Sequence, residues 1–550
     1  METLSSSRIQ SWLSWFVRGV ILLAFFILLA RLVELQVVKG GYYKSLADGN
    51  RIRRVSIVAP RGKILARGGE ELASNVVVKK RLVLNEKGFE KSLDISDALP
   101  EEIISEAQRE YKIGADFAHV AGYLGEINEI ELNKVEAGCL EKGPRRLGDL
   151  IGRGGLEEVY DCSLRGIDGE ELIEADSMGR YVRTLGRKNP IPGSDIKTHI
   201  NFALQEFIAE TIEKEKEKLK YSKAAVVATD LSGEVLALYS TPSFNPNYFV
   251  RGDSEKITAI LDDKNLPLFN RAISGIFHPG SVYKPIVAAA ALEEGKIDRD
   301  FRFTDTGVIT IESIYGDYSY KNWYFSQYGG REGEIDTARA LTRSTDTFFY
   351  KVGELLGVDN LVAWSQKFGL DKKTGIDLTA EVAGLVPSPK WKMDVKGERW
   401  FLGNTYHMSI GQGDLAVTPL ELHTAISAIA TGGKLCLPRI VSDPECSDLK
   451  ISKSTIDYVK QGLKGACSPG GTGFTFFDFK AKKGIDVACK TGTAEINDID
   501  NATHAWFTVF APAENPEIIL TIMVEKGGEG SKVAGPIART IMDYWFGNKE

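Results

Sequence analysis

An apolar run near the amino terminus is the feature that most constrains what this chain can fold into. The uncharged core, residues 19–30, is too short at about 1.5 Å per residue to cross roughly 30 Å of hydrocarbon. Extension to 12–33 makes it long enough, with Arg18 and Arg31 near the ends, where long side chains reach water. We therefore expect a single membrane-spanning helix over 12–33, preceded by a short tail over 1–11.

Two other interpretations of this run are less favoured. A cleaved signal peptide needs small residues after its apolar core, whereas residues 31–35 read Arg-Leu-Val-Glu-Leu. A buried core helix fits poorly with a position at the extreme terminus. Basic residues occur on both sides of the run, so the charge pattern leaves the orientation open.

Composition excludes several classes of protein. Apolar residues make up 43% of the chain and charged residues 26%, which is ordinary for globular proteins and excludes disorder as the main state. One long apolar run excludes a polytopic membrane protein. The net charge of -7 argues against nucleic-acid binding. Six cysteines are too few for a disulfide scaffold, although a Cys436–Cys446 loop disulfide is as reasonable as free thiols. No His-x-x-x-His pair supports a metal site.

The pattern of elements predicts an α+β fold. Residues 34–200 are mixed, with short strands and turns, and 201–220 have the apolar spacing of a helix. Apolar runs within 224–240 and within 505–524 flank turn residues and predict two hairpins. A closing helix is expected over 536–546. Two hairpins that enclose a long, partly helical middle indicate an antiparallel sheet covered by helices.

The first chemical motif is Ser-x-x-Lys at Ser281 and Lys284. On a helix, residues three apart share a face, so a desolvated lysine amine can activate the serine as a nucleophile. The motif also occurs at Ser194 and Ser447, in loop-like surroundings that we interpret as surface accidents. Ser281 differs because it follows Pro-Gly and opens an apolar helix, where backbone N–H groups are free.

Two further elements follow in order. Ser344-Thr-Asp346 lies in a turn between helical segments, and on its own it is equally well a helix cap. Lys490-Thr-Gly follows a strand-like run, where it could bind an extended peptide at a sheet edge. A second Lys-Thr-Gly at Lys373 follows a helix end and is not favoured.

These three elements, in this order, resemble the penicilloyl-serine transferases. The wider sequence is similar to class B penicillin-binding proteins of the elongation type, nearly throughout the chain from residue 12. The matching stretches are Arg31–Gln36, Asn50-Arg51, Arg61–Leu65, Leu72-Ala73, Gly155–Glu157, Leu164–Gly166, Pro242–Pro246, Gly384–Pro389, Ser409–Gly413, Thr418-Pro419, Gly470–Gly473 and His504–Phe507.

The chain departs from the family pattern in a few places. Asp346 stands where Asn is usual, a variant associated with the elongation type, and Cys489 replaces the Gly that usually precedes Lys-Thr-Gly. Ala66 and Gly68 replace an Asp and an Asn in the non-catalytic half. We expect catalysis to be intact.

The resemblance implies a catalytic role for four residues. Ser281 would attack the penultimate D-Ala carbonyl of a stem peptide that ends in D-Ala-D-Ala, and Lys284 would take the serine proton. Ser344 would relay a proton to the leaving amine, in a positive field supplied by Lys490. An amine from a neighbouring stem would then take the acyl group. β-Lactams would acylate Ser281 because they imitate D-Ala-D-Ala.

The resemblance also implies the substrate-binding residues, which are Asp346, Thr491, Gly492 and Thr493. The two threonines would bind the substrate carboxylate, and the backbone N–H groups of Ser281 and Thr493 would form the oxyanion hole. No metal or organic cofactor is implied.

A domain organisation and a location follow from the same resemblance. Residues 34–200 would form an elongated, non-catalytic pedestal or dimerisation domain, and 201–550 the penicillin-binding transpeptidase domain. The chain would sit in the bacterial cytoplasmic membrane with its catalytic domain outside. A membrane glycosyltransferase of the elongation machinery is the expected partner.

Two other classes of function compete with this one. A β-lactamase shares the motifs but is normally soluble and about half as long. A non-enzymatic β-lactam sensor would carry a cytoplasmic effector, and a glycosyltransferase-activating scaffold could coexist with catalysis through residues 34–200.

Overall fold

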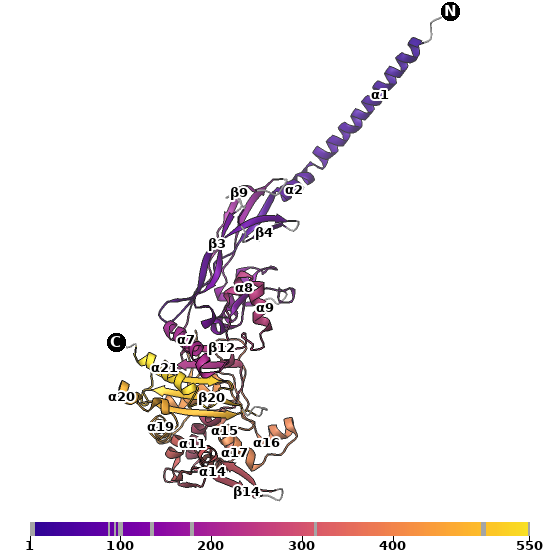
Figure 1. The fold of residues 1–550 in the computed structure, drawn as a ribbon. Coiled ribbons are helices and arrows are strands. Elements are labelled where there is room, and N and C mark those ends of the chain that lie inside the picture. Colours follow the sequence, from indigo (N-terminus) through magenta and orange to yellow (C-terminus); the bar gives the residue numbers. More distant parts are fainter. Residues whose placement is uncertain are drawn as a thin grey trace, which may run out of the picture. The chain divides into compact units, whose positions relative to one another are not determined.

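The computed structural model describes residues 6–85, 88–92, 95–96, 103–132, 137–176, 181–312, 316–496 and 502–547. The chain forms two compact units, which are coloured by sequence in Figure 1. The first comprises Met1–Pro60, Val76–Gln108 and Gly166–Pro192. The second comprises Arg61–Asn75, Arg109–Arg165 and Gly193–Glu550.

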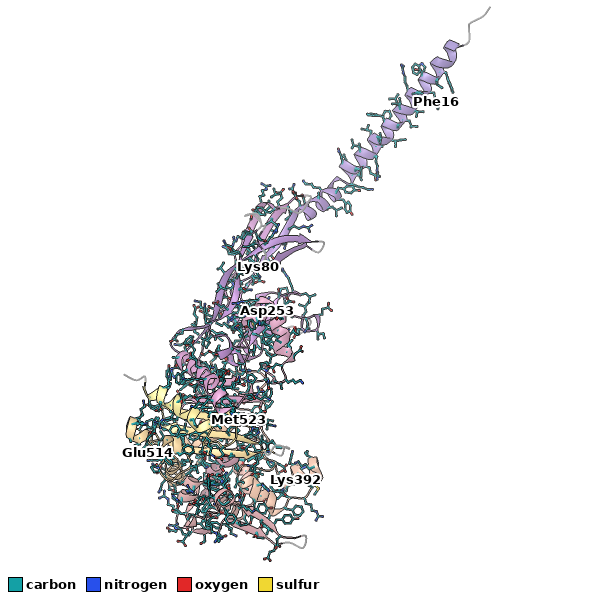
Figure 2. The ribbon with its side chains drawn as sticks, viewed as in Figure 1. Phe16, Lys80, Asp253, Lys392, Glu514 and Met523 are labelled. Atoms are coloured by element: carbon teal, nitrogen blue, oxygen red, sulfur yellow. A yellow bond between two sulfur atoms is a disulfide. The ribbon has the colours of Figure 1, made fainter. Side chains whose placement is uncertain are left out.

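An apolar helix is present where the sequence predicts one. Helix α1 spans Ser6–Val33 and continues into a π-helical turn, η1 (Glu34–Val38), and α2 (Gly40–Arg51). The stretch Trp12–Val38 has a mean hydropathy of 2.4, and none of it is buried. Its side chains, such as that of Phe16, stand out from the helix on all sides (Figure 2). By length and composition this helix could cross a membrane.

The first unit is built on antiparallel strands. Strand β8 (Gly169–Ala175) lies between β1 (Ile52–Ile57) and β9 (Tyr181–Lys188). Val55 and Ile173 form its small buried core. In the same unit, β4 (Gly88–Ser92) pairs with the later part of β3 (Glu71–Asn85).

The second unit centres on a five-stranded antiparallel sheet with the order β12-β11-β21-β20-β19. Both predicted hairpins are confirmed: β11 pairs with β12, and β20 with β21. Their bounds are Ala224–Thr229 (β11), Val235–Thr241 (β12), Thr503–Ala511 (β20), Ile518–Val524 (β21) and, for the remaining strand, Ala488–Glu495 (β19). Strand β19 ends this order, so one of its edges carries no strand in the described part of the chain.

Helices cover both faces of this sheet, because the strands are apolar on both sides. On one face the strands pack with α7 (Phe202–Leu219) and α21 (Ala534–Gly547), which lie side by side in Figure 1. The helix predicted over 201–220 is thus confirmed, with Asn201 as its N-cap, and the closing helix starts two residues earlier than expected.

A larger helical layer packs on the other face. Its main helices are α11 (Lys284–Glu293), α13 (Thr337–Arg343), α14 (Asp346–Leu356), α15 (Val358–Lys367), α17 (Leu402–Ser409), α18 (Pro419–Ala430) and α19 (Lys453–Ala466). The α+β class is therefore confirmed. The candidate catalytic residues lie where this layer meets β19.

All six cysteines are paired in the second unit. The disulfides are Cys139–Cys162, Cys436–Cys446 and Cys467–Cys489. For Cys436 and Cys446 the sequence did not decide between a disulfide and free thiols, and the other two disulfides were not expected.

Candidate active site

Ser281 lies on a tight turn that is held against two other segments. It belongs to a single 3-10 turn, η5 (Gly280–Tyr283), which leads into α11. Gly280 has a φ of 55° and donates its N–H to the Gly411 carbonyl at 2.8 Å. A side chain at Gly280 would meet the Thr493 carbonyl oxygen at 3.0 Å. Only glycine fits both the conformation and the space, so the Ser281 turn and β19 lie in contact.

The residues just before this turn are fixed by the helical layer and the sheet. The Trp506 indole N–H donates to the His278 carbonyl at 2.9 Å, and the His278 ring Nδ1 lies 2.6 Å from the Leu415 carbonyl oxygen. The His504–Phe507 stretch and the segment after Ser409–Gly413 therefore hold the residues that precede Ser281. His504 itself is buried and packs on Phe277.

Ser344 is the point at which the three motifs meet. It caps α13 in the left-handed region, with a φ of 58°, and is only 4% exposed. Its Oγ accepts a hydrogen bond from Lys490 Nζ at 2.8 Å and lies 3.3 Å from Lys284 Nζ. Three segments distant in the sequence thus converge on one hydroxyl group.

Lys284 is fully buried and makes three hydrogen bonds. It donates to Asp346 Oδ1 at 2.6 Å, to the Ser344 carbonyl at 2.7 Å and to the Ser344 hydroxyl. In the described part of the chain, no hydrogen bond joins Lys284 to Ser281. Burial lowers the pKa of Lys284, while the negative charge of Asp346 opposes that shift.

Lys490 is also fully buried, on β19. Besides Ser344, it donates to the Thr491 carbonyl at 3.1 Å. Burial and the nearby charge of Lys284 hold the pKa of Lys490 well below its usual value. Two amines that share one hydroxyl group disfavour double protonation, so the pair is suited to moving a proton.

Asp346 sits in a buried network that the sequence did not reveal. Its Oδ2 accepts the Trp323 backbone N–H at 2.9 Å, and its own N–H donates to Asn322 Oδ1 at 3.2 Å. The Asn322 amide donates to Asp305 at 3.1 Å, and Thr347 donates to Asp305 at 2.7 Å. No short motif marks these residues. Both Asp346 oxygens are thus engaged by protein groups.

The other expected substrate-binding residues lie along β19. Thr491 Oγ1 donates to Thr472 Oγ1 at 2.8 Å, within the Gly470–Gly473 stretch. Thr493 is exposed, and its Oγ1 accepts the Gly530 N–H at 3.3 Å.

The strand around Lys490 is fixed by close packing and by a covalent bond. A side chain at Gly492 would lie 2.8 Å from Val282, so the glycine allows β19 to approach the turn that contains Ser281. Cys489, where the family usually has Gly, forms a disulfide with Cys467 at the end of α19. Lys490 therefore follows directly after a cross-linked residue.

The other copies of the Ser-x-x-Lys and Lys-Thr-Gly motifs are exposed. Ser194 precedes a short strand, β10 (Ile196–Lys197), and Lys373 lies in the loop after α15. Ser447 lies in a two-stranded sheet, on β18 (Cys446–Asp448), and not in the loop that we expected. None of the three contacts Ser344 in the described residues.

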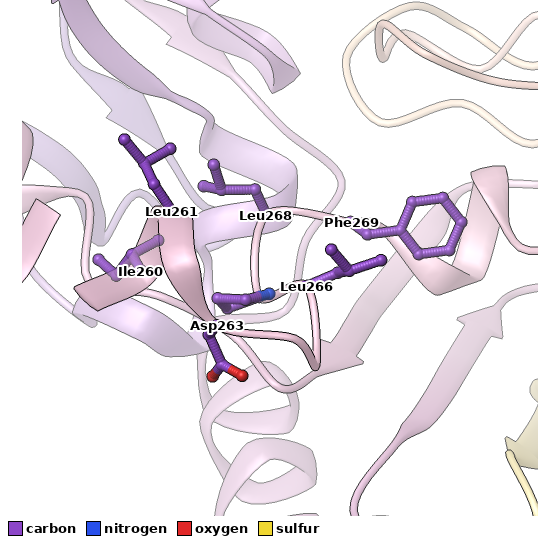
Figure 3. A pocket seen from close by; sticks show the side chains of 7 residues that line it. Ile260, Leu261, Asp263, Leu266, Leu268 and Phe269 are labelled. Atoms are coloured by element: carbon purple, nitrogen blue, oxygen red, sulfur yellow. The ribbon is translucent and has the colours of Figure 1, made fainter. Parts of the chain in front are cut away.

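One hollow away from these residues offers little chemistry. An apolar hollow of about 310 Å³ is lined by α9 (Ser254–Asp262) and the loop after it (Figure 3). Asp263 is its only titratable lining residue, and no candidate catalytic residue lines it. Among the described residues, no group of three or more His, Cys, Asp or Glu side chains could hold a metal ion.

Comparison with protein families gives two matches. The penicillin binding protein transpeptidase domain matches residues 223–543, and the penicillin-binding protein dimerisation domain matches residues 78–198. The chain is 30% identical to the peptidoglycan D,D-transpeptidase MrdA of Salmonella typhimurium, over 96% of this chain and 94% of that protein. It is 31% identical to MrdA of Escherichia coli K12, over 95% and 92%.

Solved structures agree with these matches. Penicillin-binding protein PBP2 of Pseudomonas aeruginosa, in complex with WCK 5153, has 30% identity and a TM-score of 0.70, over 90% of this chain and 96% of that one. PBP2 of Helicobacter pylori, in complex with MreC, has 25% identity and a TM-score of 0.76, over 90% and 99%. A peptidoglycan synthase complex chain has 27% identity and a TM-score of 0.76, over 99% of both chains. The chain therefore belongs to the penicillin-binding protein transpeptidases, and within them to the peptidoglycan D,D-transpeptidases of the elongation type.

Proposed function

We propose that this D,D-transpeptidase cross-links stem peptides through an acyl-enzyme on Ser281. The Ser281 oxygen attacks the penultimate D-Ala carbonyl, the D-Ala-D-Ala peptide bond breaks, and an ester to Ser281 forms. Thr491 and Thr493 bind the terminal carboxylate. The backbone N–H groups of Ser281 and Thr493 stabilise the oxyanion, in line with the contact between the Ser281 turn and β19.

Proton transfer accompanies each bond change. Lys284, in its neutral form, takes the Ser281 proton, and Ser344 passes a proton to the amine of the leaving D-Ala. An amine of a neighbouring stem then attacks the ester, loses a proton through the same groups and restores Ser281. Because the pKa of Lys284 is lowered by burial, its neutral form is more accessible than that of an exposed lysine.

One observation carries these roles. Lys284 Nζ and Lys490 Nζ both reach Ser344 Oγ, at 3.3 and 2.8 Å, and so assemble three distant motifs into one proton-transfer site. Asp346, which the resemblance placed in substrate binding, acts instead by holding Lys284, since its two oxygens are already engaged.

The location is part of the same proposal. Residues 1–11 form a cytoplasmic tail, 12–33 anchor the chain in the bacterial cytoplasmic membrane, and the remainder lies outside. Three disulfides in the second unit support this orientation, because disulfides persist in oxidising compartments and are rare in the cytosol.

We assign residues 34–200 to a pedestal or dimerisation domain and 201–550 to the transpeptidase domain. The partners are the stem peptide, β-lactams and a membrane glycosyltransferase of the elongation machinery. Similarity to a chain of a peptidoglycan synthase complex supports the last of these.

Labelling with a fluorescent penicillin tests the proposal. The full chain in detergent should be labelled, and Ser281→Ala should abolish labelling. The matched controls Ser194→Ala and Ser447→Ala remove the serine of the other two Ser-x-x-Lys copies, both exposed, and should leave labelling near the wild-type level. Labelling of folded Ser281→Ala, or its loss in either control, would contradict the choice of nucleophile.

A further inference from the structure

The free edge of β19 gives a bound peptide a defined direction. Strand β20 occupies one side of β19, and no strand occupies the other in the described part of the chain. An open edge of this kind binds an extended peptide as an added strand. In the proposed function, the side chains of Thr491 and Thr493 bind the terminal carboxylate, and the scissile carbonyl, one residue further from that end, lies at the Thr493 N–H. The substrate therefore runs from its carboxyl end at Lys490 towards Glu495.

Glu495 is the next position along this edge. Alternation places its side chain on the same face of the strand as Thr491 and Thr493, and Glu495 and Thr493 are exposed whereas Ala494 is buried. An extended peptide advances about 3.4 Å per residue. The residue that precedes the two D-Ala residues therefore reaches Glu495.

The surroundings leave this carboxylate available to a cation. No ion pair within 4 Å engages Glu495 in the described part of the chain. Its negative charge acts on His407 of α17 and Tyr350 of α14, opposing the lowered pKa of His407 and adding to the raised pKa of Tyr350, both of which arise mainly from burial. The other carboxylate that acts on His407, Asp414, is already paired with Lys392 at 2.9 Å.

The substrate carries a cation at the corresponding place. A stem peptide has a diamino acid just before D-Ala-D-Ala, because the side-chain amine of that residue is what forms cross-links. In a donor stem this amine is free and protonated. We propose that Glu495 binds the side-chain ammonium group of the donor diamino acid and so selects the donor peptide. This inference rests on the proposed function, which sets the direction of the substrate.

Two synthetic peptides test it. One is an N-acylated Lys-D-Ala-D-Ala and the other has norleucine in place of Lys, so that they differ only in the ammonium group. The release of D-Ala gives kcat/KM for each peptide, and the ratio within one variant cancels any common loss of rate. The wild type should prefer the Lys peptide by roughly fivefold, as expected for a partly exposed ion pair. Glu495→Gln should bring the ratio close to one.

A second glutamate substitution controls for the loss of a surface charge. Glu514→Gln changes an exposed glutamate in the β20–β21 turn, labelled in Figure 2, and should keep the wild-type ratio. An unchanged preference in Glu495→Gln, or no preference in the wild type, would overturn the assignment. Penicillin labelling that does not depend on Ser281 would instead refute the proposed function itself, so the two failures are distinguishable.

Discussion

Replacement of Asp346 by Asn should move the acid limb of acylation to lower pH. Asp346 Oδ1 lies 2.6 Å from the fully buried Lys284 Nζ, and its charge raises the pKa of Lys284 against the larger effect of burial. Asn removes the charge but keeps the size of the side chain. The pKa of Lys284 should therefore fall further. An adjacent opposite charge typically changes a pKa by about 1 to 3 units, or roughly 1.4 to 4 kcal/mol.

The direction of this pH shift follows from the role of Lys284 as the general base. A general base acts when neutral, so acylation rises as pH increases through the Lys284 pKa. A lower pKa places this rise about 1 to 3 pH units lower in the variant. The plateau should also fall, because the Asn amide can satisfy only one of the two contacts that Asp346 makes, with Lys284 and with the Trp323 N–H.

Stopped-flow acylation by a chromogenic β-lactam across pH, normalised to each variant's own plateau, measures this shift. Asp359→Asn is a suitable control because it removes an exposed charge from α15. An unmoved acid limb in Asp346→Asn, or one displaced to higher pH, would show that Lys284 is not the base that titrates.

Further substitutions test the roles of the two active-site lysines and of the Cys467–Cys489 disulfide. Lys284→Arg keeps a positive charge that cannot be lost at working pH, so the acylation rate of this variant should nearly vanish. Lys490→Arg keeps the charge that Lys490 supplies and should retain part of the rate. Acylation rates of the two folded variants test this, and equal losses would mean that the base is wrongly assigned. The double variant Cys467→Ala/Cys489→Ala removes a cross-link between residues 22 apart and should cost about 3 kcal/mol of stability in the catalytic unit. Thermal loss of penicillin binding measures that cost, and a midpoint equal to the wild type's would count against it.

Local patterns predicted much of the fold. The hairpins and the helix after Asn201 follow from apolar spacing and turn residues within short windows, and the structure forms them as expected. The surroundings of Ser281 also distinguished it from Ser194 and Ser447. These features depend on neighbours in the sequence, which is why they can be read from it.

Contacts between distant segments could not be predicted in this way. Nothing near Cys467 or Cys489 in the sequence indicates that the end of α19 lies beside β19. Asp305 and Asn322 belong to no motif, yet they hold the backbone of Asp346. The pairing of Asp346 with Lys284 likewise became visible only in three dimensions, because it depends on the packing of α11 against α14.

The role of Ser281 as the nucleophile is tested most directly by locating the acyl group on the protein. The full-length protein is incubated briefly with benzylpenicillin, quenched, digested and mapped by mass spectrometry. We expect one penicilloyl adduct, on the peptide that contains Ser281, that persists long after the free drug is removed. An adduct on another residue would contradict the assignment of the nucleophile, and rapid loss with turnover of the drug would indicate a β-lactamase.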